Sequence, residues 1–263
     1  MKSMKFRTEP KGLELVKHAL KIYNNQLAKV SITTDNQSRS TEIVRNLLLA
    51  QFCMVSYQNL KGACTLITEG DYYTPNALCR GILEHFISWA YIEKNPEAHI
   101  YQFVNDATRK QYLFTKILLG PLGDNIPDKK RLATRKEDLE IELEAGKATH
   151  GLWETRLEGR AREAGLQDVY DTAYRLLSSI VHPDALQGDF FFSDEQVSPI
   201  VIHEYRDDKK QWYLSIHTAL LNTNYLMKEL DKTLNLNEYH RLELIDKEAL
   251  RLLTNRSDNS IDE

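Results

Sequence analysis

Apolar residues in this chain recur mostly at alternating steps of three and four, the spacing that builds one face of an α-helix. The first stripe runs through Leu13, Val16, Leu20, Tyr23 and Leu27. The residues that interrupt helices are scarce: there are 11 Gly and 7 Pro among 263 residues, about 7% of the chain against roughly 12% in average usage. The sequence therefore predicts an all-α fold, a helical bundle of about seven to eight helices.

Capping residues and helix breakers set the expected boundaries. Ser40 is a typical N-cap, and Thr74 followed by Pro75 is a typical start. Residues 128–144, with five basic and six acidic side chains, are expected to form an extended solvated helix or a mobile arm. Residues 200–205 have β character. The other predicted helices cover about 10–30, 40–68, 75–94, 96–119, 152–164, 167–181, 211–234 and 237–254.

Charge and composition restrict the function. The chain has 34 Lys and Arg against 38 Asp and Glu, a formal net charge of −4, which excludes a protein that coats nucleic acid through global positive charge. No stretch is long and apolar enough for a signal peptide or a membrane span. Cys53, Cys64 and Cys79 form no CxxC pair, so we expect buried thiols and a cytoplasmic protein that has no membrane contact.

Several kinds of active site find no support in the sequence. The eight histidines form no HxxxH or HExxH pair, so no metal site is expected. There is no GxGxxG and no GxxxxGK[ST] loop for a nucleotide, and no GxSxG turn for a serine hydrolase. No cofactor is therefore predicted.

The segment YRLLSSIVHP, residues 174–183, is the best candidate for chemistry. Arg175 and His182 are two helical turns apart, and Ser178 and Ser179 lie between them, so one stripe presents a guanidinium, two hydroxyls and an imidazole. An Arg can hold a phosphate through two hydrogen bonds. A His that titrates near neutrality can take a proton from a ribose 2′-hydroxyl.

A second segment, YYTPNALCRGILEHFISWAYIEKNP, contains Arg80 and Glu84 four residues apart, where they can pair along the helix. Arg80 and His85 also fit an Arg-to-His spacing of five to seven residues. On an ideal helix, however, their side chains point about 140° apart. Only Arg175 and His182 combine this spacing with a shared face.

Together these two segments resemble a bacterial domain family of unknown function placed in the HEPN superfamily, helical domains common in toxin–antitoxin and phage-defence loci. The resemblance spans about residues 40–235. It divides the chain into an N-terminal helix and linker (1–39), a HEPN-like helical domain (40–235) with a charged helical insertion (128–165), and a C-terminal helix with a disordered tail (236–263).

The resemblance implies a bundle with a HEPN-like core, in which Arg80 and Glu84 face the stripe from Arg175 to His182. Active members of the superfamily are metal-independent endoribonucleases that work as homodimers. By position, Arg175 would bind the scissile phosphate, His182 would act as acid or base, and Arg80 and Glu84 would support them. The expected partners are RNA, a second copy of the chain, and an antitoxin or defence protein.

Two alternatives remain open at this stage. Active members often have a polar residue directly after the motif arginine, whereas this chain has Leu176, which leaves room for Arg80 as the phosphate ligand. In the first alternative, the chain is a catalytically inert HEPN-like module that binds a nucleotide or a protein partner. In the second alternative, Arg80, Glu84 and His182 form a buried structural network that fixes the helix register.

Overall fold

The computed structural model describes residues 11–32, 40–120, 128–181 and 209–257. These residues form helices joined by short turns, with no strand among them, which confirms the all-α prediction. In chain order, the helices are α1 (Lys11–Leu27), α2 (Thr41–Thr68), α3 (Pro75–Lys94), α4 (Pro96–Leu119), α5 (Lys129–His150), α6 (Leu157–Ala164), α7 (Gln167–Val169), the π-helical turn η2 (Tyr170–Tyr174), α8 (Arg175–Val181), α10 (Lys209–Leu234) and α11 (Tyr239–Ser257).

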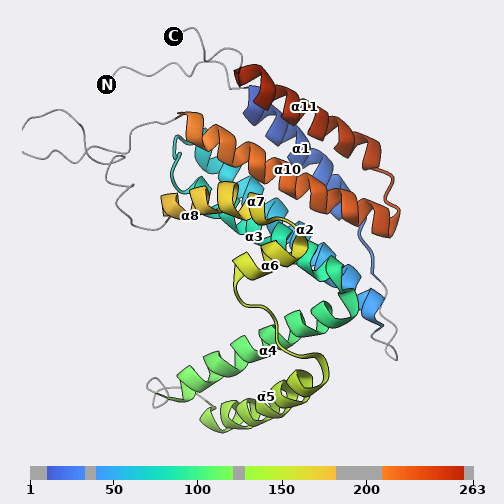
Figure 1. Ribbon diagram of the computed structural model, residues 1–263, viewed down its shortest axis with the longest axis vertical. Helices are drawn as coiled ribbons and strands as arrows, with labels where there is room; N and C mark the ends of the chain where they lie inside the picture. Colours follow the sequence, from blue (N-terminus) through green and yellow to red (C-terminus); the bar gives the residue numbers. More distant parts are fainter. Residues whose placement is uncertain (1–10, 33–39, 121–127, 182–208, 258–263) are drawn as a thin grey trace, which may run out of the picture.

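The centre of the bundle is formed by α2, α3 and α10, which pack against one another. Helices α1 and α11 lie side by side and cover α10 from the outside (Figure 1), while α6 and α8 pack on α3. One hydrophobic cluster runs through all of these helices, from Leu13 in α1 to Ala249 in α11. All three cysteines lie buried in it as free thiols, as expected from the sequence.

Capping residues and prolines in the sequence explain where the central helices begin. The Ser40 hydroxyl accepts a hydrogen bond from the backbone N–H of Ile43, so Ser40 caps α2 as predicted. Pro75 occupies the first turn of α3, and Pro96 the first turn of α4. The first helix, expected to reach residue 30, ends at Leu27.

Helices α4 and α5 form an antiparallel hairpin that projects from the bundle (Figure 1). Residues 128–144 were expected to form an extended helix or a mobile arm, and the helix is observed, as part of α5. Its inner face packs on α4 through Leu139, which is 1% exposed, and the Tyr101 ring stacks on His150 at a centroid distance of 4.4 Å. The rest of α5 is mostly exposed.

The segment between α5 and α6 departs from the prediction. A helix was expected from about residue 152, but α6 begins at Leu157, and residues 151–156 form no regular structure. Gly151 turns the chain at φ +79°, a conformation that favours glycine. Trp153 then inserts between Tyr91 and Phe103, at ring-centroid distances of 5.0 and 5.2 Å. The burial of the Trp153 indole stabilises this irregular segment more than a continued helix would be stabilised by the spacing of its apolar residues.

The predicted helix over 167–181 is present, but it contains the π-helical turn Tyr170–Tyr174. Such a turn holds one residue more than an α-turn and therefore rotates the residues that follow it. It places the rings of Tyr170 and Tyr174 in a stack, with centroids 5.1 Å apart. The β segment at 200–205 and nearly all of the polar tail lie outside the described residues, and the three-part division of the chain stays a prediction.

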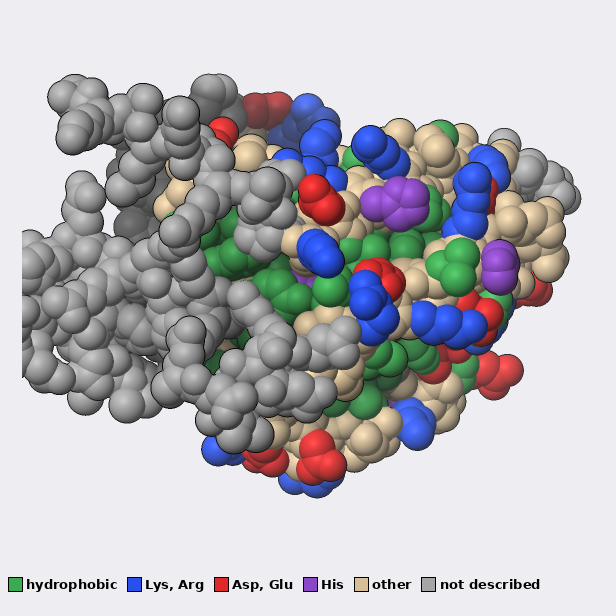
Figure 2. Space-filling view, turned by 90° about the horizontal axis from the view of Figure 1, so that it is seen from above, with side chains coloured by type: hydrophobic (Ala, Val, Ile, Leu, Met, Phe, Trp, Pro, Cys, Tyr) green, Lys and Arg blue, Asp and Glu red, His purple; other side chains and the backbone are tan. Residues whose placement is uncertain are grey.

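The surface carries charges of both signs. On the face shown in Figure 2, Lys and Arg side chains lie beside Asp and Glu side chains and do not gather in one field. This mixture agrees with the slightly negative net charge of the chain. Within the described part of the chain, no helix is long and apolar enough to cross a membrane.

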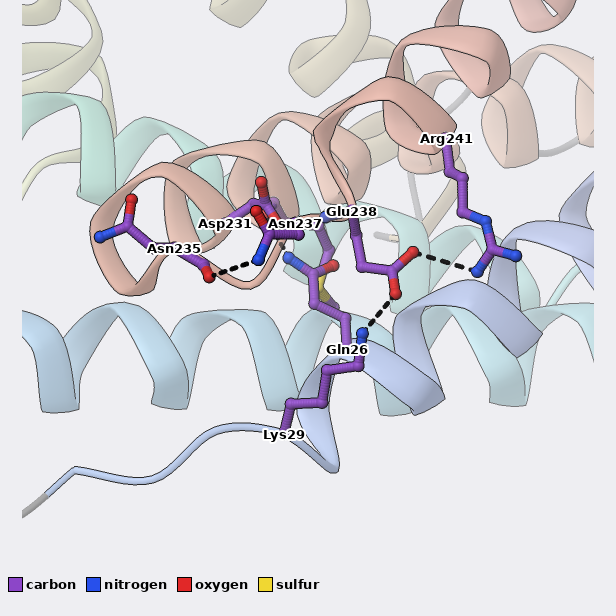
Figure 3. Close-up of polar contacts among 8 residues, drawn as sticks. Gln26, Lys29, Asp231, Asn235, Asn237, Glu238 and Arg241 are labelled. Atoms are coloured by element: carbon purple, nitrogen blue, oxygen red, sulfur yellow. Dashed lines mark hydrogen bonds and ion pairs between the residues drawn. The ribbon is translucent and has the colours of Figure 1, made fainter.

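A polar clasp ties the end of α1 to the turn between α10 and α11 (Figure 3). The Glu238 carboxylate accepts hydrogen bonds from the Lys29 ammonium (2.5 Å) and from the Arg241 guanidinium (3.1 Å). Its backbone N–H donates to the buried Asp231 carboxylate at 2.8 Å. In the last turn of α1, the buried Gln26 amide donates to the carbonyl oxygen of Met227 at 2.7 Å. These contacts fix α1 against the C-terminal helices.

We predict that Glu238→Gln destabilises the protein by about 1–2 kcal/mol at neutral pH, because it weakens hydrogen bonds between charged groups. The Lys29 ammonium holds the pKa of the Glu238 carboxyl below its usual value. The stabilisation is therefore complete above the ordinary glutamate pKa of about 4.3 and is lost as the pH falls through the folded-state pKa.

Urea unfolding of both proteins from neutral to acid pH measures this difference, which should shrink as the pH falls. Glu248→Gln is the matched control, because Glu248 pairs with an arginine three residues along α11 but is exposed, so it should change stability little. Equal effects of the two substitutions would contradict the role given to the clasp.

Candidate functional site

Arg80 and Glu84 form the predicted ion pair on α3, and Tyr174 completes it from the π-helical turn. The Arg80 Nε donates to Glu84 Oε1 and to the Tyr174 hydroxyl, both at 3.1 Å. The Tyr174 hydroxyl in turn donates to Glu84 Oε1 at 2.9 Å. The guanidinium also lies over the Tyr174 ring, 5.2 Å from its centroid. We call Arg80, Glu84 and Tyr174 the triad.

Burial determines the charge state of the Tyr174 phenol. Tyr174 is 9% exposed, and its burial, together with the negative charge of Glu84, raises the pKa of its phenol. The phenol is therefore protonated at neutral pH and acts as a hydrogen-bond donor to Glu84. The side chains of Arg80 and Glu84 are 22% and 40% exposed, so a ligand in solvent can reach this edge of the bundle.

A second guanidinium, that of Arg160, contacts α3 one turn after Glu84. Arg160 of α6 donates to the Ser88 hydroxyl at 2.5 Å, and that hydroxyl donates to the backbone carbonyl of Glu84 at 2.6 Å. The Arg160 guanidinium also lies over the Trp153 ring, 5.2 Å from its centroid. Burial lowers the pKa of Arg160, while the charge of Glu84 opposes this shift. An arginine keeps its proton despite such a shift.

Arg175 follows Tyr174 directly but points away from the triad. Its side chain is 60% exposed, with Nε 3.1 Å from Asp171 Oδ1 and Nη2 3.8 Å from Glu158 Oε1. Its guanidinium carbon lies 5.6 Å from the Tyr170 ring centroid. Consecutive helical residues point about 100° apart, so Tyr174 faces α3 while Arg175 faces solvent.

The remaining predicted site residues are only partly covered by the structure. Ser178 is half-buried on α8, one turn after Arg175. Ser179 belongs to the same helix, but its side chain, like the whole of His182, lies outside the described residues. The shared face of Arg175 and His182 therefore stays a prediction. Arg80 and Glu84 contact Tyr174, the residue before the stripe from Arg175 to His182. That they face the stripe itself stays a prediction.

Arg80 and His85, whose spacing places their side chains about 140° apart on an ideal helix, have different contacts. The His85 Nδ1 lies 3.2 Å from the Ser56 hydroxyl of α2, whereas Arg80 contacts Tyr174 on the other side of α3. Burial lowers the pKa of His85, so its neutral form is favoured. In the described part of the chain, no group of three or more His, Cys, Asp or Glu side chains is placed to hold a metal ion.

Sequence reasoning missed two members of this site. Tyr174 stands at the start of the motif segment, but the π-helical turn that aims it at α3 leaves no signature in the residue spacing. Arg160 could have been found, because it lies on the face of α6 that carries Leu157, Ala161 and Ala164. A charged residue on an apolar helix face needs a partner.

Comparison with protein families gives one match. The family described as "Family of unknown function (DUF5677)" matches residues 46–198, which include the triad, Arg160 and Arg175. A comparison with curated proteins and one with solved structures gave no match.

We predict that Glu84→Gln lowers the free energy of unfolding by about 1–2 kcal/mol, because Arg80 and Tyr174 lose a charged acceptor. For a chain of this size the expected fall in Tm is about 2–4 °C. Thermal unfolding followed by circular dichroism measures it. Glu69→Gln, at an exposed position after α2, is the control. A Tm equal to that of the wild type would show that the triad does not stabilise the junction of α3 and α8.

Proposed function

This chain belongs to the family of unknown function DUF5677, and we propose that it is a metal-independent endoribonuclease of a bacterial toxin or anti-phage defence system. It would cut single-stranded RNA through attack of a ribose 2′-hydroxyl on the adjacent phosphodiester. Placement in the HEPN superfamily and action as a homodimer are parts of this proposal. It rests on the residues of α8 and on the resemblance of residues 40–235 to that superfamily.

The observation that carries the proposal is the exposed guanidinium of Arg175 at the start of α8. Its partners, Asp171 and Glu158, are themselves about half exposed. Exposed ion pairs of this kind contribute about 0–1 kcal/mol, so a phosphate that accepts two hydrogen bonds can replace them. Arg175 is thus available to an anionic ligand in the described structure.

The chemistry follows from the residue types. Arg175 holds the scissile phosphate, and His182 removes the proton of the 2′-hydroxyl as the new O–P bond forms. The bond to the 5′-oxygen breaks, and that oxygen leaves with a proton. The products are a 2′,3′-cyclic phosphate and a 5′-hydroxyl. Single-stranded RNA is the expected substrate, because the 2′-hydroxyl can line up with the phosphate there.

Arg80 and Glu84 have a supporting role in this proposal. The triad anchors the residue that precedes Arg175, so it fixes the position at which α8 begins. The Ser178 hydroxyl, one turn further, is proposed to donate a hydrogen bond to a phosphate held by Arg175. Ser179 is proposed to contribute in the same way.

The second candidate function is a catalytically inert module that binds a nucleotide or a protein partner. The observation that favours it is the carboxylate beside each candidate phosphate ligand: Glu84 lies against Arg80, and Asp171 lies against Arg175. The apolar Leu176, which is 41% exposed, also stands where active relatives of the superfamily often have a polar residue.

The direct test is digestion of single-stranded RNA in the presence of EDTA. We predict cleavage by the wild type and a loss of about 100-fold or more in His182→Ala, because general acid–base groups contribute at least this much. Arg175→Lys should also lose activity, since lysine cannot hold a phosphate in a planar fork. The cut ends should be 2′,3′-cyclic phosphates.

Two exposed side chains of α11, His240 and Arg251, provide matched controls. His240→Ala and Arg251→Lys should cleave like the wild type. Cleavage by His182→Ala at the wild-type rate would overturn the assignment. Nucleotide binding without turnover, measured by calorimetry, would favour the inert module.

A further inference from the structure

Helix α5 has a charge order that its own stability does not explain. Residues 129–136 contain five basic and no acidic side chains, and residues 137–144 contain five acidic and no basic ones. The first turn holds basic but no acidic residues, although the positive end of the helix dipole favours acidic residues there.

Four of these side chains lie on one exposed face, which we call the charged stripe: Arg131, Arg135, Asp138 and Glu142. Their spacing of four, three and four keeps them on one side of the helix. Arg131 and Arg135 are like charges at i and i+4, and so are Asp138 and Glu142. Both pairs weaken an isolated helix. Within the single chain, Arg135 reaches two turns along α5 to contact Glu142, at 3.2 Å.

A second α5 laid antiparallel on this face would relieve both repulsions. The stripe has opposite signs at positions equally distant from its centre, between residues 136 and 137. In the antiparallel arrangement, Arg131 therefore meets Glu142 of the second copy, and Arg135 meets Asp138. No like charges of the stripe meet. We propose that the charged stripe is a self-association surface through which two copies of this chain pair along α5.

The position of α5 in the fold suits such a contact. The hairpin of α4 and α5 projects from the bundle (Figure 1), and α5 packs on α4 through the face that carries Leu139. The stripe lies beside that face and is exposed along its whole length, so a second helix can approach without displacing α4. Helix α5 lies apart from α8 (Figure 1), so the charged stripe is distinct from the candidate site. The proposal of self-association therefore does not rest on the proposed function.

Exposed ion pairs are individually weak and are screened by salt. The association is therefore a salt-sensitive equilibrium. We expect the dissociation constant to rise about tenfold or more between about 0.05 M and about 0.5 M NaCl. Sedimentation equilibrium of the full chain over this range measures it.

Charge reversal tests the geometry. Arg131→Glu with Arg135→Glu makes the stripe wholly acidic, and Asp138→Lys with Glu142→Lys makes it wholly basic. Each double variant alone should lose the salt-sensitive association, and an equimolar mixture of the two should recover it. Arg251→Glu on α11 is the control and should associate like the wild type. Circular dichroism of each variant checks that the helices are intact.

The mixture separates this surface from other forms of association. Recovery of a dimer only in the mixture requires that opposite stripes meet. A wild type that stays monomeric at low salt and high protein concentration overturns the proposal. So does a double variant that keeps the salt-sensitive association on its own, or a mixture that does not recover it.

Discussion

The enclosure of α3 is the constraint on which the rest of the structure depends. This helix packs against α2, α4, α6, α8 and α10, and residues such as Ile82 and Trp89 are fully buried. Polar side chains on this helix lose much of their contact with water, and unpaired buried polar groups are costly. Tyr174 therefore pairs with Arg80 and Glu84, and Arg160 pairs with Ser88. These contacts fix how α6 and α8 lie on α3.

The parts of the fold that could be predicted are those set by local chemistry. Ser40 and Pro75 act through their own side chains and backbone within one helical turn, so their positions alone predict where α2 and α3 begin. The segment before α6 could not be predicted in this way. Its residues have helical spacing, but Trp153 gains more from burial between α3 and α4 than from continuing a helix. Such a preference depends on side chains far away in the sequence.

In the candidate site, too, contacts within one helix could be predicted and contacts between helices could not. The spacing of Arg80 and Glu84 predicts their ion pair, because both lie on one helix. The spacing of Tyr174 and Arg175 does not predict which of them meets α3, because the π-helical turn sets the rotation of α8. The prediction from the motif concentrated on Arg175, yet Tyr174 makes the contact with Arg80 and Glu84. His182 lies outside the described residues, so its position stays a prediction.

The surroundings of Arg175 and Arg80 decide which of them can serve as the phosphate ligand in the proposed reaction. An anion that takes Arg175 from Asp171 breaks an exposed pair, at a cost of about 0–1 kcal/mol. An anion that takes Arg80 leaves Glu84 without its cation, which costs about 1–3 kcal/mol more in a partly buried place. In the proposed reaction, Arg175 is therefore the better ligand and Arg80 the support. Because the net charge of the chain is slightly negative, RNA bound as proposed would be held by few phosphate contacts, and its binding would depend less steeply on salt than binding to a broad basic surface.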